Sequence, residues 1–150
     1  MVSLAIDMQI VTLGREHLSG VAKIEQECFS QPWSEKALEI LLADNAVAVV
    51  AVLDGEAVAY AGMTSVLDEG QITNVATLPS CRRRGFSRAV LEELIARAKA
   101  KGISSIFLEA RVSNVPALSL YESLGFCRIG TRRRFYSAPV EDAVLMELKI

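Results

Sequence analysis

Two periods of apolar and polar residues run along the chain, and they predict an alternation of strands and helices. Period-two alternation, or a continuous run of apolar β-formers, is typical of strands. Such segments lie at residues 8–13, 46–53, 56–66, 71–77, 105–110, 126–136 and 143–148. Apolar residues spaced three and four apart predict helices at 15–29, 34–42, 85–101 and 114–124. The predicted order is therefore β-α-α-β-β-β-α-β-α-β-β.

Turn residues support this division and narrow the fold class. Asp54-Gly55 between two strands is a tight-hairpin signal, Pro79 ends the next strand, and Gly102 is suited to the end of the longest helix. The strand at 105–110 follows a crossover helix, so we expect it to pair in parallel. The sequence therefore predicts an α+β fold: one mixed, mostly antiparallel central sheet of about seven strands with helices on both faces.

Composition excludes several classes of protein. Hydrophobic residues make up 51% and charged residues 23%, which is typical of a globular chain and not of a disordered one. The net charge of −2 argues against a protein that coats nucleic acid. No apolar run approaches about 18 residues, and the N-terminus carries Asp7 and no basic region. We therefore expect neither a membrane span nor a signal peptide.

The three cysteines indicate the redox setting. Cys28, Cys81 and Cys127 are far apart and odd in number, so they give neither a metal-binding spacing nor a disulfide framework. Reduced thiols in a cytoplasmic protein are the expected state.

The stretch 72–101 combines an apolar strand, a proline, a basic glycine turn and a long helix. Such a turn can present backbone N–H groups to a phosphate, and Gly85 would let a pyrophosphate approach closely. The turn matches neither the Walker A pattern nor the G-x-G-x-x-G fingerprint of dinucleotide-binding folds. Taken alone, it is equally compatible with a solvated basic loop.

Three polar residues downstream could carry chemistry. Glu109 stands at the C-terminal end of a predicted strand, a common place for catalytic groups. Asn114 and Tyr121 are seven residues apart, so they share one face of a predicted helix. Taken alone, Glu109 could also be a surface carboxylate or a partner of Arg111, and Tyr121 a core aromatic with a hydrogen-bonded hydroxyl.

Together these segments resemble the GNAT family of N-acetyltransferases over nearly the whole chain. The cofactor loop of that family has the pattern Q/R-x-x-G-x-G/A, and residues 82–87 (RRRGFS) match it except at Ser87, where Gly or Ala is usual. Within the family the chain is most similar to the RimI-type ribosomal-protein N-terminal alanine acetyltransferases. The similar stretches are IEQECFSQPWSEKAL, LEARVSN, ALSLYESLGF and the final RRRFY…EDAVLMEL.

The resemblance implies one GNAT domain over residues 1–150, acetyl-CoA as co-substrate, no metal, and direct transfer of acetyl to a protein N-terminal α-amine. It assigns the role of base to Glu109 and of acid to Tyr121. The residues that it implies for cofactor binding are Val75, Ala76 and Thr77 (acetyl and pantetheine part), Arg82, Arg83, Arg84, Gly85, Phe86, Ser87 and Arg88 (pyrophosphate), and Asn114. Those considered for the acceptor are Trp33, Arg134 and Tyr136.

The identity of the acceptor stays open at this point. It could be the N-terminal alanine of a small-subunit ribosomal protein, or a small amine such as a polyamine, an amino acid or an aminoglycoside, because a fold does not fix a substrate. A non-catalytic acetyl-CoA-binding module is a third alternative. We expect a monomer or weak dimer that binds neither membrane nor nucleic acid directly.

Two features near the expected acceptor site have more than one interpretation. Trp33 could be a hydrophobic staple of the second helix or part of the acceptor wall. The arginines at 132–134 could form a solvated edge, contact the acceptor peptide, or contact ribosomal RNA. In a regular strand, Arg132 and Arg134 would share one side and Arg133 the other.

Overall fold

The computed structural model describes residues 8–150. Its strands are β1 (Met8–Thr12), β2 (Ala46–Leu53), β3 (Glu56–Val66), β4 (Glu69–Thr77), β5 (Ser105–Arg111), β6 (Cys127–Ser137) and β7 (Val140–Lys149). Its helices are α1 (Leu18–Cys28), α2 (Glu35–Leu38), α3 (Phe86–Ala100) and α4 (Val115–Ser123), with 3₁₀ turns η2 (Arg15–His17), η3 (Glu39–Leu42) and η4 (Pro79–Cys81). No helix in this part of the chain is both long and apolar enough to cross a membrane.

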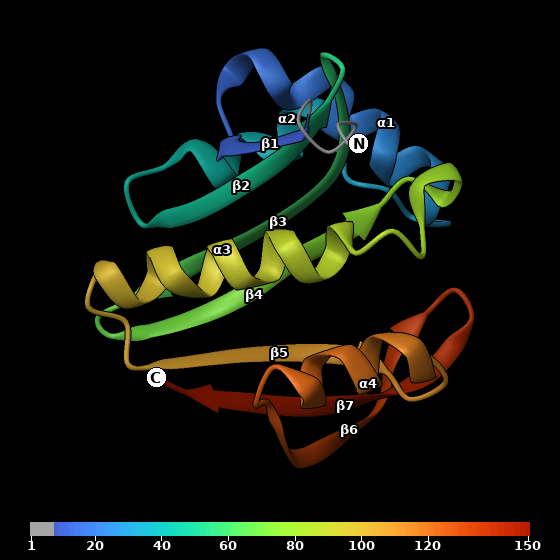
Figure 1. Ribbon diagram of the computed structural model, residues 1–150. Helices are drawn as coiled ribbons and strands as arrows, with labels where there is room; N and C mark the ends of the chain where they lie inside the picture. Colours follow the sequence, from blue (N-terminus) through green and yellow to red (C-terminus); the bar gives the residue numbers. More distant parts are fainter. Residues whose placement is uncertain (1–7) are drawn as a thin grey trace.

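The strands form one seven-stranded sheet in the order β1-β2-β3-β4-β5-β7-β6 (Figure 1). Every neighbouring pair is antiparallel except β4 and β5, which are parallel because α3 crosses over between them. The hairpin between β2 and β3 turns at Asp54 and Gly55, which have φ angles of 52° and 83°. Two consecutive positive φ angles are those of the tight turn that this dipeptide favours.

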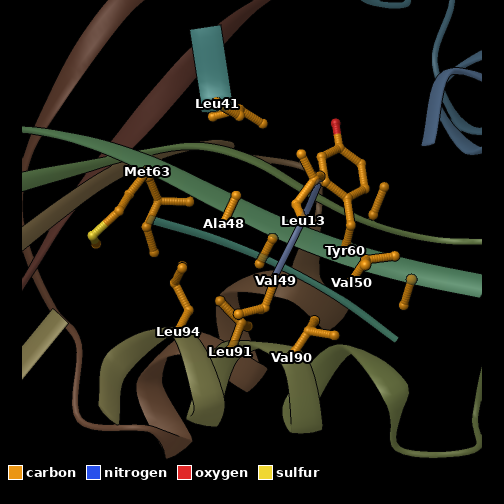
Figure 2. Packing of buried hydrophobic residues seen from close by; sticks show 14 of the residues in the cluster. Leu13, Leu41, Ala48, Val49, Val50, Tyr60, Met63, Val90, Leu91 and Leu94 are labelled. Atoms are coloured by element: carbon orange, nitrogen blue, oxygen red, sulfur yellow. The ribbon is translucent and has the colours of Figure 1, made fainter. Parts of the chain in front are cut away.

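Helices cover both faces of the sheet, so the predicted fold class is confirmed. Figure 2 shows Val90, Leu91 and Leu94 of α3 on one side of the strands, with Leu41 and the ring of Tyr60 on the other. All five residues are buried. The α3 residues follow the spacing of three and four that predicted this helix, so the apolar stripe read from the sequence is the one that packs.

The second predicted helix is shorter than expected. An α-helix was expected over 34–42, but α2 ends at Leu38 and η3 continues as a 3₁₀ turn. Ser34 does cap α2, with its Oγ accepting from the Ala37 N–H at 3.1 Å. The buried residues Leu38 and Leu41 are three apart, and 3₁₀ geometry aligns residues three apart on one face. Packing on the sheet therefore favours the tighter turn.

The two central strands, β4 and β5, separate after a short paired segment. β4 and β5 share only three parallel residue pairs, which end at Gln71–Phe107. From there β4 continues with β3 alone, and β5 with β7 alone. Thr73 has no partner in the β3–β4 register, which marks a β-bulge just where the strands separate. Bulges bend and twist a strand locally, so this one helps to turn β4 away from β5.

The core can be tested with two identical substitutions in different surroundings. Leu91 is fully buried, whereas Leu67 in the β3–β4 turn is 95% exposed. We expect Leu91→Ala to lower the free energy of unfolding by about 2–5 kcal/mol, because it leaves a cavity under the sheet. Leu67→Ala should change it by less than about 0.5 kcal/mol. Urea unfolding of both variants measures the difference, and equal effects would contradict this assignment of the core.

Candidate active site

A cleft of about 500 Å³ lies where β4 and β5 diverge. Its walls come from the end of α1 and the loop before α2, the second halves of β4 and β5, the start and middle of α4, and the β6–β7 hairpin. The predicted site residues that line it are Trp33, Val75, Glu109, Asn114, Tyr121 and Tyr136. The fold thus gathers residues that are up to about a hundred positions apart in the sequence.

The carboxylate of Glu109, on β5, is held from two sides. Its Oε2 lies 3.0 Å from Nε of Arg132, and its Oε1 accepts a hydrogen bond from Nε2 of Gln71 at 3.3 Å. The Glu109 side chain is 21% exposed and that of Arg132 is 59% exposed, so water reaches the ion pair from the arginine side. Arg132 thereby has a partner that none of the three sequence interpretations of the arginine cluster included.

Two tyrosines, Tyr121 and Tyr136, also line this cleft. Burial, together with a smaller effect of Tyr136, raises the pKa of Tyr121 to about 12. Burial and the nearby charge of Glu109 also raise the pKa of Tyr136, and the Arg111 guanidinium opposes this rise. Both phenols therefore keep their protons at neutral pH and can donate hydrogen bonds.

The second half of β4 has backbone groups that no strand uses. The Leu78 N–H donates to the Val58 carbonyl at 2.8 Å, which fixes the alternation of bonds between β4 and β3. Only every second residue of an antiparallel strand bonds to its partner strand. Val75 and Thr77 therefore direct their N–H and C=O groups away from β3, toward the gap left by β5. The Thr77 carbonyl agrees with this direction, because it accepts from Nε of Arg82 at 3.4 Å.

The basic turn enters α3 through left-handed backbone. Gly85, the N-cap, has a φ of 83°, and Arg83 has a φ of 65°. Glycine adopts such a conformation at little cost. Within residues 8–150 no side chain caps α3, so the N–H groups of its first turn are available to an anion. Buried Phe86 anchors the start of the helix against the core.

Arginines surround this helix start. Arg82 is tied to β4 through the Thr77 carbonyl, the Arg84 guanidinium lies 5.2 Å from the centre of the Phe86 ring, and Arg88 donates to Oγ of Ser123 on α4 at 2.6 Å. Positive charge and free N–H groups thus lie at the same helix start, which fits a pyrophosphate.

Ser87 has a structural partner. Its Oγ lies 2.6 Å from Oγ1 of Thr77, so the first turn of α3 is linked to the end of β4. Ala76 lies beside that link with its side chain buried, and it pairs with Tyr60 of β3. The serine that departs from the family pattern therefore joins the turn to the strand.

Asn114 and Trp33 are each fixed by one local bond. Asn114 caps α4, with its Oδ1 accepting from the Ala117 N–H at 3.3 Å. The Trp33 backbone N–H donates to Oε1 of Glu25 at 2.9 Å, which holds the loop before α2 against α1. Both residues keep part of their side chain at the cleft.

Arg134 lies outside the cleft lining. Arg132 pairs with Ala143 and Tyr136 with Glu141, so the β6 residues between them stand opposite a single β7 residue. Arg134 is exposed there, with a φ of 53° and its N–H donating to Oδ1 of Asp142 at 2.9 Å. This bulge breaks the alternation that the sequence predicted for the arginine cluster.

Three polar residues stand out among the lining residues that the sequence did not predict. Glu25 is only 2% exposed, and its Oε2 accepts from the Tyr60 hydroxyl at 2.5 Å. Asn74 is 7% exposed, and its Oδ1 has no hydrogen-bond partner within the described chain. The Arg111 guanidinium lies 4.3 Å from the centre of the Tyr136 ring and pairs with Glu141 at 3.1 Å.

A signal for two of them is present in the sequence. Glu25 occupies an apolar position of its helix, and Asn74 stands between Ile72 and Ala76 in the alternating row of its strand. A polar residue in a buried stripe costs free energy unless something bonds it, so both positions could have been singled out. Arg111 gives no such signal, because its partners come from the distant β6–β7 hairpin.

Known proteins resemble this chain in sequence and in structure. The sequence model of the Acetyltransferase (GNAT) family matches residues 18–126. The [ribosomal protein bS18]-alanine N-acetyltransferase of Escherichia coli (strain K12) is 36% identical over 143 residues, covering 94% of this chain and 97% of that protein. The enzyme of the same name from Haemophilus ducreyi is 32% identical over 93% of this chain and 98% of its own.

The structural comparison agrees. The crystal structure of the ribosomal-protein-S18-alanine N-acetyltransferase from Escherichia coli superimposes with a TM-score of 0.89, over 95% of this chain and 94% of that one, at 36% identity. Sequence and fold thus match over nearly the whole length. The chain belongs to the GNAT family of acetyltransferases.

Proposed function

We propose that this protein transfers the acetyl group of acetyl-CoA to the α-amine of an N-terminal alanine in a ribosomal protein. The observation that carries the proposal is one cleft lined by both a hydrogen-bonded carboxylate, Glu109, and a protonated phenol, Tyr121. The 36% identity to the Escherichia coli enzyme supports the same acceptor. We expect the reaction to take place in the cytoplasm, in a single domain spanning residues 1–150.

Glu109 is the proposed base. An α-amino group has a pKa of about 7.7–8.0, against about 10.4 for a lysine side chain, so a useful fraction is already neutral at pH 7. A modest base is then sufficient to take the proton that the amine loses as the C–N bond forms, directly or through one water. Arg132 and Gln71 fix the direction of the carboxylate, so its free lone pairs can face the cleft.

Tyr121 is the proposed acid. Acetyl-CoA supplies a thioester, and its sulfur becomes negative as the C–S bond breaks. A phenol of pKa about 12 stays protonated and can donate to that sulfur. Complete transfer to a thiolate of pKa about 8.5 would be uphill by about 5 kcal/mol. Tyr121 therefore acts as a hydrogen-bond donor that stabilises the negative charge on the leaving sulfur, and the thiolate departs with that charge or takes a proton from solvent.

The remaining cofactor residues have separate tasks. A free N–H of Val75 or Thr77 would donate to the acetyl oxygen on which negative charge builds, and the Val75 carbonyl would accept from a pantetheine amide. The uncapped first turn of α3, with Gly85 and the surrounding arginines, would hold the pyrophosphate. The Asn114 side chain, at the N-terminus of α4, would contact the pantetheine part of the cofactor.

The acceptor side favours a peptide. The loop before α2 and the β6–β7 hairpin face each other across the cleft, and Oγ of Ser30 bridges them by donating to the Ala138 carbonyl at 3.0 Å. Trp33 and Tyr136 line this side, and Arg111 stacks on Tyr136. A channel between two loops suits an extended chain end that enters with its amine first.

The role assignments can be tested by steady-state kinetics. With acetyl-CoA and a peptide that begins with alanine, we expect Glu109→Gln and Tyr121→Phe each to lower kcat/KM by about 10²–10⁴-fold. Glu122→Gln is a matched control: Glu122 neighbours Tyr121 in the sequence, pairs with Arg128 of β6 at 3.1 Å, and lies outside the cleft lining. It should retain activity within about twofold.

Two outcomes would contradict the proposal. Near-wild-type rates in both cleft variants would remove the roles of Glu109 and Tyr121. Rapid acetylation of polyamines or aminoglycosides with no turnover of peptides would instead keep the chemistry and replace the acceptor.

The raised pKa of Tyr121 predicts a pH dependence of stability. In the unfolded chain the phenol ionises near pH 10, whereas in the folded protein it ionises near 12. The phenol therefore loses its proton first in the unfolded state. The contribution of this phenol to the unfolding free energy is fully present below pH 10 and falls as the pH rises toward 12. Relative to Tyr121→Phe, the wild type should lose up to about 3 kcal/mol of unfolding free energy over this range. Parallel pH profiles of urea unfolding for the two proteins would contradict it.

The link between Ser87 and Thr77 predicts a stability effect and not a binding effect. Ser87→Ala removes one hydroxyl of the 2.6 Å contact, so we expect a loss of about 1 kcal/mol in unfolding free energy. The KM for acetyl-CoA should change by less than about threefold, because alanine is usual there in the family. Ser80→Ala, an exposed serine at the other end of the turn, is the control. A KM that rises tenfold at unchanged stability would show that the hydroxyl contacts the cofactor.

A further inference from the structure

The Asn74 side chain is the one group in this cleft whose bonding the proposed function leaves unexplained. Its Oδ1 is buried and lacks any hydrogen-bond partner among residues 8–150, although the side chain lines the cleft. A buried acceptor without a partner costs about 1–3 kcal/mol, so such a group calls for a ligand or a structural reason. The residue is 7% exposed, so bulk water does not supply the bond along its surface.

The register of the sheet decides which way Asn74 faces. Asn74 pairs with Gly62, and a Cβ at Gly62 would lie 2.7 Å from Leu41, so this pair faces the α1–α2 side. Gln71 pairs with Thr64, which is two residues from Gly62 and on the same side. Without the bulge at Thr73, odd and even positions would place Gln71 and Asn74 on opposite faces. The bulge therefore brings Asn74 to the face that carries the Gln71–Glu109 hydrogen bond.

Asn74 and Glu109 are consequently on facing walls of one cleft, on the same side of the sheet. Asn74 is on β4 and Glu109 on β5, each beyond the last residue pair that joins these strands. The nearby Tyr60 hydroxyl donates to Glu25. The Asn74 carboxamide lines the cleft, and its oxygen has no hydrogen-bond partner within residues 8–150.

We propose that the Asn74 carboxamide oxygen accepts a hydrogen bond from the acceptor amine and positions it for attack opposite Glu109; this inference rests on the proposed function. A neutral primary amine attacks through its lone pair and carries two hydrogens. Both become more positive as the C–N bond forms. One leaves to Glu109, and the other stays on nitrogen as the N–H of the product amide. That second hydrogen needs an acceptor inside the cleft, and Asn74 supplies one.

A chain of hydrogen bonds lies close to Asn74. The Tyr60 hydroxyl and the Trp33 N–H both donate to Glu25, which links β3 to the loop before α2. Asn74, Glu25 and Trp33 line the same cleft, so Asn74 lies near the wall along which the acceptor enters. An acceptor on β4 would also disfavour a secondary amine, which carries a single hydrogen on nitrogen and has none left for Asn74 once Glu109 has taken it.

The test compares two acceptors in three proteins. The acceptors are one peptide that begins with alanine and the same peptide beginning with N-methylalanine. The proteins are the wild type, Asn74→Leu and Asn74→Ser. Asn74→Leu removes both polar atoms of the carboxamide at similar size. Asn74→Ser places a small polar residue at this position and keeps the test possible if the leucine variant does not fold. We expect kcat/KM for the alanine peptide to fall about tenfold in both variants, which corresponds to one lost hydrogen bond.

The ratio of the two acceptors is the readout that a merely structural role would not move. The wild type should prefer the alanine peptide, and this preference should shrink about tenfold in either variant, because steric effects of the methyl group are common to all three proteins. The Kd for CoA and the free energy of unfolding are measured alongside, and the Kd should stay within about twofold. If the wild type is active on peptides and the ratio of the two acceptors is the same in the variants as in the wild type, this inference alone is overturned. A wild type inert toward every N-terminal peptide would overturn the proposed function with it.

Discussion

Parallel pairing between β4 and β5 lasts for three residue pairs, and the chemistry of the site depends on where it stops. Each strand keeps its other neighbour, so the sheet stays whole at its flanks while its centre opens. The backbone N–H and C=O groups that β5 would have bonded are left to a ligand, and buried backbone groups without partners are costly. A substrate that lies along β4 can therefore satisfy groups that the fold leaves unpaired. Binding free energy and the geometry of attack then come from the same few atoms.

The charged side chains of the cleft are each held by a partner before any substrate arrives. Glu109 pairs with Arg132, and Glu141 accepts from both Arg111 and the Ser113 N–H at 2.7 Å, which keeps the pKa of Glu141 low. Such bonds fix directions more than they add stability, because exposed ion pairs contribute little. Among the uncharged polar side chains that line the cleft, the oxygen of Asn74 is buried and has no hydrogen-bond partner within the described residues. An otherwise satisfied site with one open acceptor implies that the ligand brings the missing donor.

The sequence predicted those parts of the molecule that rest on local pattern. The apolar stripe of α3, the Asp54-Gly55 hairpin and the order of strands and helices along the chain each follow from local pattern. What it could not predict depends on register: the bulge at Thr73 decides which side Asn74 faces, and the one in β6 separates Arg132 from Arg134. A single extra residue reverses the face of every residue after it, and nothing in an apolar strand marks that insertion. The Glu109–Arg132 contact was missed for the same reason.

The two sides of the cleft are built by different kinds of bond, and this separates chemistry from acceptor choice. Glu109 and the backbone groups of β4 belong to sheet strands, whose positions are fixed by ladders of hydrogen bonds. The loop before α2 is joined to the β6–β7 hairpin by Oγ of Ser30, which donates to the Ala138 carbonyl, and to α1 by the Trp33 N–H, which donates to Glu25. Substitutions in these loops can change the channel without moving the base or the acetyl site. Members of the family can therefore share one reaction and differ in acceptor, and for this chain the residues that read the acceptor are to be sought on the two loops and at Asn74, which reaches from the rigid side toward the variable one.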